Sequence, residues 1–161
     1  MLKKAERYQA TLEALKRRGV DFQKLAAILF DLQKKYNPNM TIEQCLHHIM
    51  KVLEKTEVQH AVLTGIAIDE LVEAKQFPSP IQEIIERDEG LYGIDEILAL
   101  SITNIYGSIG LTNFGYLDKV KPGIIGVYDT KGNGGVHTFL DDILCAIVAA
   151  GASRLAHSEA E

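Results

Sequence analysis

The chain has 161 residues, of which 47% are hydrophobic and 24% charged, a composition typical of globular rather than disordered proteins. Its formal net charge of −5, with acidic and basic residues interspersed, disfavours a nucleic-acid binder, because such proteins usually carry a basic face. The two cysteines lie far apart and form no CxxC pair or His/Cys cluster, so we expect reduced core thiols and no zinc site.

The first half of the chain has the apolar spacing of amphipathic helices. We expect one helix over residues 2–18, ended by Gly19, and a second that begins after the N-cap Asp21 and ends before an Asn-Pro dipeptide. Two Thr-x-x-Gln capping boxes then predict helices of about 14 and about 19 residues by the usual stop signals. The boxes are Thr41 with Gln44 and Thr56 with Gln59. Pro80 is well placed to begin a short helix that runs to about Arg87.

A long helix is predicted over residues 94–109, because one stripe of its surface is apolar at spacings of three and four residues. The stripe begins with a carboxylate and consists of Asp95, Leu98, Ala99, Ile102, Ile105, Tyr106 and Ile109. A shorter helix is expected over residues 113–121, ended by Pro122. Residues 123–136 contain five glycines and few core residues, so they predict a loop.

The segment 138–152 predicts the most buried helix of the chain. Thr138 is a good N-cap, and Asp141 stands three residues later, where a capping box usually has Glu. The residues that follow are almost all small and apolar, which is typical of a helix buried on most sides. Together these patterns predict an all-α fold. We expect one domain over residues 1–161, a compact bundle of roughly six to eight helices around buried central helices.

The helices that contain Ile94 and Ile143 are the candidates for the centre of this bundle. Because so small a chain has limited interior for its apolar helix surface, we also expect a homo-oligomer.

The N-terminus is charged and has no signal-peptide core, and the longest apolar run, residues 143–152, is about half of what a bilayer crossing needs. We therefore expect a cytoplasmic protein, and peripheral contact with the inner face of the membrane is compatible with this.

Acidic and basic residues gather in the C-terminal half, near two helix starts and the glycine-rich loop. They are Asp95, Glu96, Asp118, Lys119, Lys121, His137, Asp141 and Asp142. Several carboxylates without thiolate ligands suit a hard cation such as Mg²⁺ or Mn²⁺, and lysines beside them suit a phosphate group. Glycines let backbone N–H groups approach an anion closely. The pattern indicates a metal–phosphate site, although the loop lacks the Gly-Lys-Ser/Thr sequence of a Walker A motif.

A purely structural explanation stands beside this one. Acidic residues in the first turn of a helix interact favourably with its dipole, which alone could account for Asp95 or Asp141. Adjacent residues point about 100° apart on a helix, so Asp141 and Asp142 cannot chelate one ion from a single face. One of them could bind the metal while the other caps the helix. His137 could be a base, a phosphate contact or a plain surface residue.

Three blocks resemble the phosphatidylglycerophosphatase A family: IDEILAL at 94–100, YLDKVKPG at 116–123 and GGVHTFLDDILCAIVAA at 134–150. The resemblance to the broad family covers residues 90–152, and the whole chain resembles its soluble branch, the low-temperature-requirement C protein type. The chain lacks the transmembrane segments and the N-terminal glycine- and proline-rich motif of the membrane-bound members. It also has Gly123 where a tryptophan often follows the proline.

The resemblance implies an all-helical, Mg²⁺-dependent phosphomonoesterase that converts phosphatidylglycerophosphate to phosphatidylglycerol and phosphate. It implies a family site at the acidic and basic residues of the three blocks, in which carboxylates bind the metal. The metal candidates are Asp95, Glu96, Asp118, Asp141 and Asp142. The catalytic candidates are Asp142, Lys119, Lys121 and His137. The substrate would carry a phosphorylated lipid head group or be a small phosphomonoester, and no nucleic acid is expected as a partner.

Two other functions remain open: a non-enzymatic helical protein of cold adaptation or membrane homeostasis, and a phosphatase of a soluble phosphomonoester.

The proposed metal site needs the pairs Asp95-Glu96 and Asp141-Asp142 to converge in space. We expect them to do so, because each pair begins a core-type helix and such helices pack side by side. Asp142 is expected to matter more for the metal than Asp141, since capping already explains Asp141.

Overall fold

The computed structural model describes residues 1–129 and 135–158. Within these ranges the chain forms nine α-helices and one 3₁₀ helix, η1, and no strand, which confirms the predicted all-α class. The elements are α1 (Lys4–Arg17), α2 (Phe22–Gln33), α3 (Ile42–Leu53), α4 (Thr56–Glu73), α5 (Ile81–Glu86), α6 (Ile94–Thr103), η1 (Asn104–Tyr106), α7 (Ser108–Val120), α8 (Ile124–Asp129) and α9 (Leu140–Ser158). No helix in the described ranges is long and apolar enough to cross a membrane.

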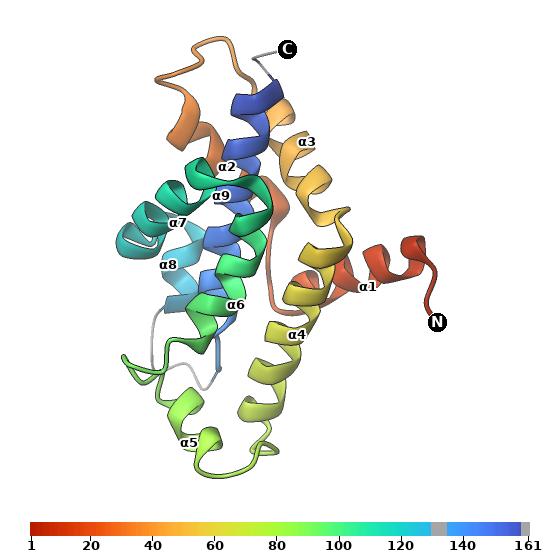
Figure 1. Cartoon of the computed structure of the whole chain (residues 1–161), viewed down its shortest axis with the longest axis vertical. Helices are drawn as coiled ribbons and strands as arrows, with labels where there is room; N and C mark the ends of the chain where they lie inside the picture. Colours follow the sequence, from red (N-terminus) through yellow and green to blue (C-terminus); the bar gives the residue numbers. More distant parts are fainter. Residues whose placement is uncertain (130–134, 159–161) are drawn as a thin grey trace.

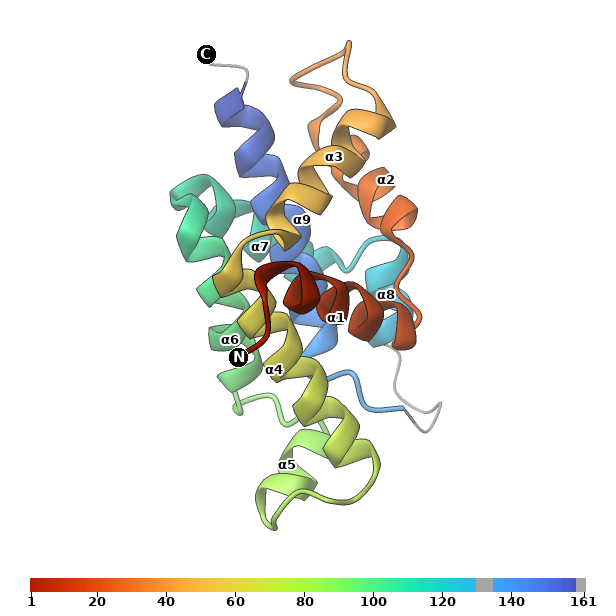
Figure 2. The same ribbon diagram turned by 90° about the vertical axis from the view of Figure 1, so that its right-hand side faces the viewer.

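Helix α9 forms the centre of the molecule, as the sequence predicts. Every residue from Leu140 to Ser153 is buried, and α2, α3, α4, α6, α7 and α8 all pack against this helix. Figure 1 shows α9 running through the middle, with α3 and α4 on the right, α7 and α8 on the left and α6 in front. Its alanine-rich sequence lets these neighbours approach closely. In Figure 2, α1 lies across α4.

The second predicted central helix, 94–109, is interrupted and partly exposed. Helix α6 ends at Thr103, and Gly107 has a φ of +82°, a conformation that L-residues with a side chain rarely adopt. Both α6 and α7 pack against α9, but the stripe residues Ile105 and Ile109 are 37% and 43% exposed, so the predicted stripe is not one continuous buried face. The outer face of α6 remains at the surface, where Ile94 and Ile97 are 53% and 63% exposed.

The segments on either side of Pro122 also differ from the prediction. The helix expected over 113–121 is α7, which begins five residues earlier, at Ser108. Part of the loop expected over 123–136 is the short helix α8, and Ile125 of this helix is fully buried. Glycines permit such a turn of helix once tertiary packing offers a buried position for Ile125. The rest of that prediction, at residues 130–134, lies outside the described residues.

One of the two predicted capping boxes is present. Thr41 and Gln44 exchange side-chain and backbone hydrogen bonds at the start of α3. Thr56 is instead the first residue of α4, after the N-cap Lys55. Its hydroxyl and the Gln59 amide oxygen accept hydrogen bonds from the Arg7 guanidinium, at 3.2 and 2.8 Å, so this motif joins α4 to α1.

Candidate functional site

The N-terminus of α9 is capped by a carboxylate from α4. Both oxygens of Asp69 accept hydrogen bonds from the Phe139 amide, at 3.0 and 3.2 Å, and Oδ2 also accepts one from the Leu140 amide at 2.9 Å. Asp69 is fully buried, and burial raises its pKa to about 8 in spite of these hydrogen bonds. The predicted N-cap, Thr138, is not the cap, because α9 begins two residues later, at Leu140; the Thr138 hydroxyl instead donates to the Ile85 carbonyl at 2.6 Å.

Sequence reasoning missed Asp69, although a signal for it exists. Asp69 falls at the same helical spacing as the buried residues Val62, Ile66 and Val72 of α4. A lone carboxylate within such a stripe must find hydrogen-bond donors, because an unpaired buried charge is costly. The stripe indicates that a partner is needed, but it does not say that the donors lie some seventy residues further along the chain, at the start of α9.

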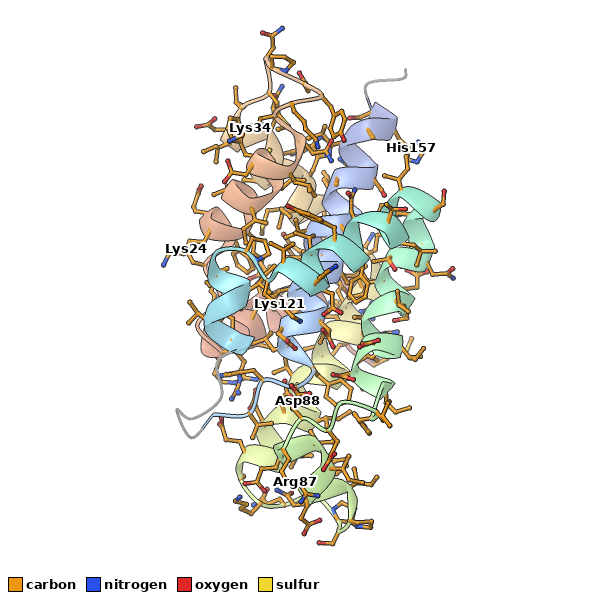
Figure 3. The ribbon with its side chains drawn as sticks, turned by 90° about the vertical axis from the view of Figure 1, so that its left-hand side faces the viewer. Lys24, Lys34, Arg87, Asp88, Lys121 and His157 are labelled. Atoms are coloured by element: carbon orange, nitrogen blue, oxygen red, sulfur yellow. The ribbon has the colours of Figure 1, made fainter. Side chains whose placement is uncertain are left out.

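Carboxylates of α7 and α9 meet around a single lysine. Lys121 follows α7 in the left-handed conformation, with a φ of +49°, and its side chain turns back toward the start of α9. Its ammonium Nζ lies 2.6 Å from Asp118 Oδ1, 2.8 Å from Asp141 Oδ2 and 3.2 Å from Asp142 Oδ1. Figure 3 shows Lys121 near the middle of the face formed by α7, α8 and α9. The short distances indicate charge-assisted hydrogen bonds.

Asp95, in the first turn of α6, completes this carboxylate cluster, which we define as Asp95, Asp118, Asp141 and Asp142 around Lys121. Asp95 is 8% exposed, and its carboxyl, like that of Asp118, lies within hydrogen-bonding reach of Asp142. Burial, followed by the neighbouring Asp141, raises the pKa of Asp142 to about 10. Burial also raises the pKa of Asp141 to about 6, although Lys121 opposes the shift.

Hydrogen bonds and ion pairs favour the charged forms of Asp118 and Lys121. Burial favours the neutral form of Asp118, but hydrogen bonds with Asp142 and Lys121 outweigh it and lower the pKa of Asp118. Burial likewise opposes the charged form of Lys121, yet Asp141 and the other carboxylates raise the pKa of this lysine. The cluster therefore places more acidic groups in a buried space than one lysine neutralises.

The remaining predicted site residues lie at the edge of the cluster or away from it. Glu96 is exposed beside the cluster, where burial, and then Asp118 and Asp95, raise its pKa. Lys119 is exposed in the last turn of α7, and none of the described contacts joins it to the cluster. Of the two lysines, only Lys121 therefore meets the carboxylates in the described structure.

His137 belongs to a different group of side chains. Its Nδ1 lies 3.1 Å from Nη2 of Arg18, and its ring packs edge-on against Tyr128, with 5.0 Å between ring centroids. Burial and the Arg18 charge lower the pKa of His137. Arg18 also donates to the Val136 carbonyl at 2.6 Å, so these contacts anchor the segment that leads into α9. The described contacts of His137 thus give it a structural position, not one among the carboxylates.

The cluster has the donor chemistry of a hard-cation site but not a preformed metal geometry. Among the described residues, no group of three or more His, Cys, Asp or Glu side chains is arranged to hold a metal ion. The Lys121 ammonium already occupies the space between Asp118, Asp141 and Asp142. The donors are all carboxylate oxygens, which Mg²⁺ prefers in proteins. Binding of Mg²⁺ would thus require Lys121 to move aside.

Comparison of the sequence with known proteins identifies a family whose sequence model matches this chain. The sequence model of the phosphatidylglycerophosphatase A family matches residues 15–157. The uncharacterized protein YpjQ of Bacillus subtilis is 55% identical over 153 residues, which cover 95% of this chain and 86% of YpjQ. The uncharacterized protein YutG of the same organism is 55% identical over 143 residues, which cover 89% of this chain and 86% of YutG.

A solved structure extends the comparison to the fold. The crystal structure of low temperature requirement C protein from Listeria monocytogenes is 50% identical and covers 99% of this chain and 100% of that chain, with a TM-score of 0.95. These findings confirm the resemblance drawn from the three sequence blocks, and the family match extends over almost the whole chain.

Proposed function

The chain belongs to the phosphatidylglycerophosphatase A family, and we propose that it is a Mg²⁺-dependent phosphomonoesterase that hydrolyses phosphatidylglycerophosphate to phosphatidylglycerol and phosphate. The observation that carries this proposal is the convergence of Asp118, Asp141 and Asp142 on Lys121, with Asp95 of α6 beside Asp142. So many buried acidic groups are costly for a purely structural site, whereas phosphoryl transfer uses carboxylates that bind a divalent cation.

The proposed metal ligands are the carboxylates of the cluster, Asp95, Asp118, Asp141 and Asp142, with Glu96 at its edge. Mg²⁺ bound there would polarise the phosphoryl oxygens and supply an activated water. Two of these ligands lie in the first turn of α9, so the hydrogen bonds from Phe139 and Leu140 to Asp69 hold their backbone in place. This rigid support favours a site whose ligands keep their relative positions during turnover.

Lys121 and Lys119 are the proposed contacts for the phosphoryl group. The Lys121 ammonium holds Asp118 and Asp141 together before substrate binds, and it can donate the same hydrogen bonds to phosphoryl oxygens. Lys119 is exposed one residue after Asp118, where it can meet the substrate from solvent. His137 is not part of the proposed site, because its ring contacts Arg18 and Tyr128.

A phosphate-release assay tests this proposal. The purified chain is given phosphatidylglycerophosphate in detergent micelles or glycerol 3-phosphate in solution, with Mg²⁺ or with EDTA. We expect Mg²⁺-dependent release from the lipid, loss of release in Asp142→Asn, and full release in Glu13→Gln, which changes an exposed carboxylate of α1. Release from the soluble ester alone would indicate a soluble substrate. No release from either substrate would favour a non-enzymatic role.

We also propose that the chain forms a homo-oligomer and works at the inner face of the cytoplasmic membrane. Exposed aliphatic side chains on α6 and α7 support this proposal, since Ile97, Ile109 and Leu111 are 63%, 43% and 44% exposed. Light scattering at micromolar concentration and flotation with phosphatidylglycerol vesicles test the two parts. A monomeric mass would exclude the oligomer, and failure to float would exclude the membrane contact.

A further inference from the structure

A groove of about 620 Å³ lies between α2, α7 and the turn that leads into α8. Its volume falls within the range of about 300 to 1,000 Å³ that is usual for ligand pockets. Its aliphatic lining residues are Ala27, Ile28, Leu32, Leu117, Pro122 and Ile124, and Tyr36, Thr112, Asn113 and Tyr116 add aromatic and polar groups. Lys24 and Lys35 lie at its rim. The groove thus joins an apolar floor to a basic rim.

The groove and the carboxylate cluster share one wall of the molecule. Leu117 lines the groove, and the next residue, Asp118, belongs to the cluster. In the same way, Lys121 reaches into the cluster while Pro122 lines the groove. Figure 3 shows Lys121 near the middle of the view and Lys24 at its left edge, on α2. Residues 117–122 therefore contribute side chains to both the groove and the cluster, which places the two beside the same short segment.

The turn before α8, which lines part of the groove, depends on Gly123. This residue has a φ of +58°, and a Cβ atom there would lie 3.2 Å from Cγ1 of Ile28. The turn before α8 therefore packs directly on α2, and the groove floor is continuous from one helix to the other.

We propose that this groove binds an acyl chain of the lipid substrate while the phosphorylated head group lies at the cluster. This inference rests on the proposed function, of which it specifies the substrate. Lys24 and Lys35 are exposed, whereas the one carboxylate that lines the groove, Asp31, pairs with Lys34 at 3.0 Å. The rim is thus basic above an apolar floor, which complements an anionic amphiphile.

The first test uses chain length. Dihexanoyl and dioctanoyl phosphatidylglycerophosphate are compared below the concentrations at which they form micelles, with glycerol 3-phosphate as a substrate without acyl chains. Each methylene removed from water improves binding by up to about fourfold, so KM should fall with chain length while kcat changes little. A KM that is the same for both lipids would overturn the proposal.

The second test fills the groove. Ala27→Trp places a large side chain in the groove, and Ala67→Trp makes the same change on the exposed face of α4. Binding of dansyl-labelled undecanoic acid, followed by fluorescence, should weaken at least tenfold in Ala27→Trp and remain unchanged in Ala67→Trp. Turnover of the soluble ester and the melting temperature show that Ala27→Trp is folded. If Ala27→Trp does not fold, Tyr116→Ser is used in its place. This variant removes a 55% exposed aromatic side chain from the groove lining and should also weaken binding of the probe.

The outcomes separate this inference from the proposed function. Unchanged probe binding in a folded Ala27→Trp or Tyr116→Ser variant would overturn the acyl-chain groove. A change of oligomer mass in Ala27→Trp, with unchanged probe binding, would assign the groove to contact between copies of the chain and would also overturn it. If the parent chain released phosphate from no substrate, the proposed function would fail, and the fluorescence titration would still decide whether the groove binds an acyl chain.

Discussion

Oδ2 of Asp69 lies 2.9 Å from the backbone nitrogen of Leu140, so a carboxylate of α4 caps the helix that carries Asp141 and Asp142. The first amides of a helix have no partner within the helix, and buried ones require an acceptor from elsewhere. Asp69 supplies that acceptor to Phe139 as well, and thereby fixes where α9 begins. The position of two cluster carboxylates therefore depends on a residue outside the cluster.

Replacing Asp69 should destabilise the protein more than removal of an exposed cap. In Asp69→Ala, the Phe139 and Leu140 amides lose their acceptor, at about 1 to 3 kcal/mol for each unsatisfied buried group. Asp21→Ala, which removes the exposed cap of α2, should cost only about 1 kcal/mol. Urea unfolding of both variants measures the difference. Equal losses in the free energy of unfolding would show that the Asp69 cap contributes no more stability than the exposed cap of α2.

The two adjacent aspartates should respond differently to amide substitution. Asp142→Asn should abolish Mg²⁺-dependent phosphate release but keep the fold, because an amide can replace the hydrogen bonds that the neutral Asp142 carboxyl makes with Asp118 and Asp95. Asp141→Asn should cost less activity and about 1 kcal/mol of stability, since the amide still accepts the Asp142 N–H but loses the charge that pairs with Lys121.

Phosphate release and thermal midpoints of both variants test this pair. Full activity in Asp142→Asn would contradict its assignment as a metal ligand. Equal loss of activity in both variants would mean that the two carboxylates act as a unit.

Removal of the Lys121 charge should make stability depend on Mg²⁺. Lys121→Met leaves Asp118, Asp141 and Asp142 without their cation, and loss of one partner from a buried ion pair costs about 3 kcal/mol or more. Mg²⁺ should restore much of this loss because it offers the carboxylates a replacement charge. Lys119→Met changes an exposed neighbour and is the matched control. Chemical unfolding in Mg²⁺ and in EDTA gives the comparison; an Mg²⁺-independent loss in Lys121→Met would argue against metal binding here.

His48 should make the folded protein less stable in mild acid. Burial, with the Arg154 and His47 charges, lowers its pKa to about 4 from the ordinary value of 6.5. Between these two values the unfolded chain binds a proton that the folded chain does not, so the free energy of unfolding falls as pH drops from 6.5 toward 4. His48→Gln should flatten this dependence, and His60→Gln, at an exposed histidine, should leave it unchanged. Unfolding curves at several pH values measure the slopes, and parallel slopes in all three proteins would contradict this assignment.

The sequence predicted the features that depend on nearby residues. The Thr41 box forms because donor and acceptor lie within one turn of helix. The apolar run after Asp142 predicted a buried helix, because a helix without a polar face must be surrounded. The break at Gly107 was missed, since the apolar stripe continues through it and a glycine inside a helical pattern does not reveal its φ.

The sequence alone therefore determined the helical class, the buried central helix and the acidic blocks, because spacing and capping act over a few residues. The tertiary structure decided that Asp69 and not Thr138 caps α9, that Lys121 and not Lys119 meets the carboxylates, and that Thr56 bonds to Arg7. Each of these depends on donors and acceptors whose relative positions are set only when helices pack. Thr56 illustrates the reason: its hydroxyl could serve a local amide or a distant guanidinium, and only the placement of α1 against α4 determines which.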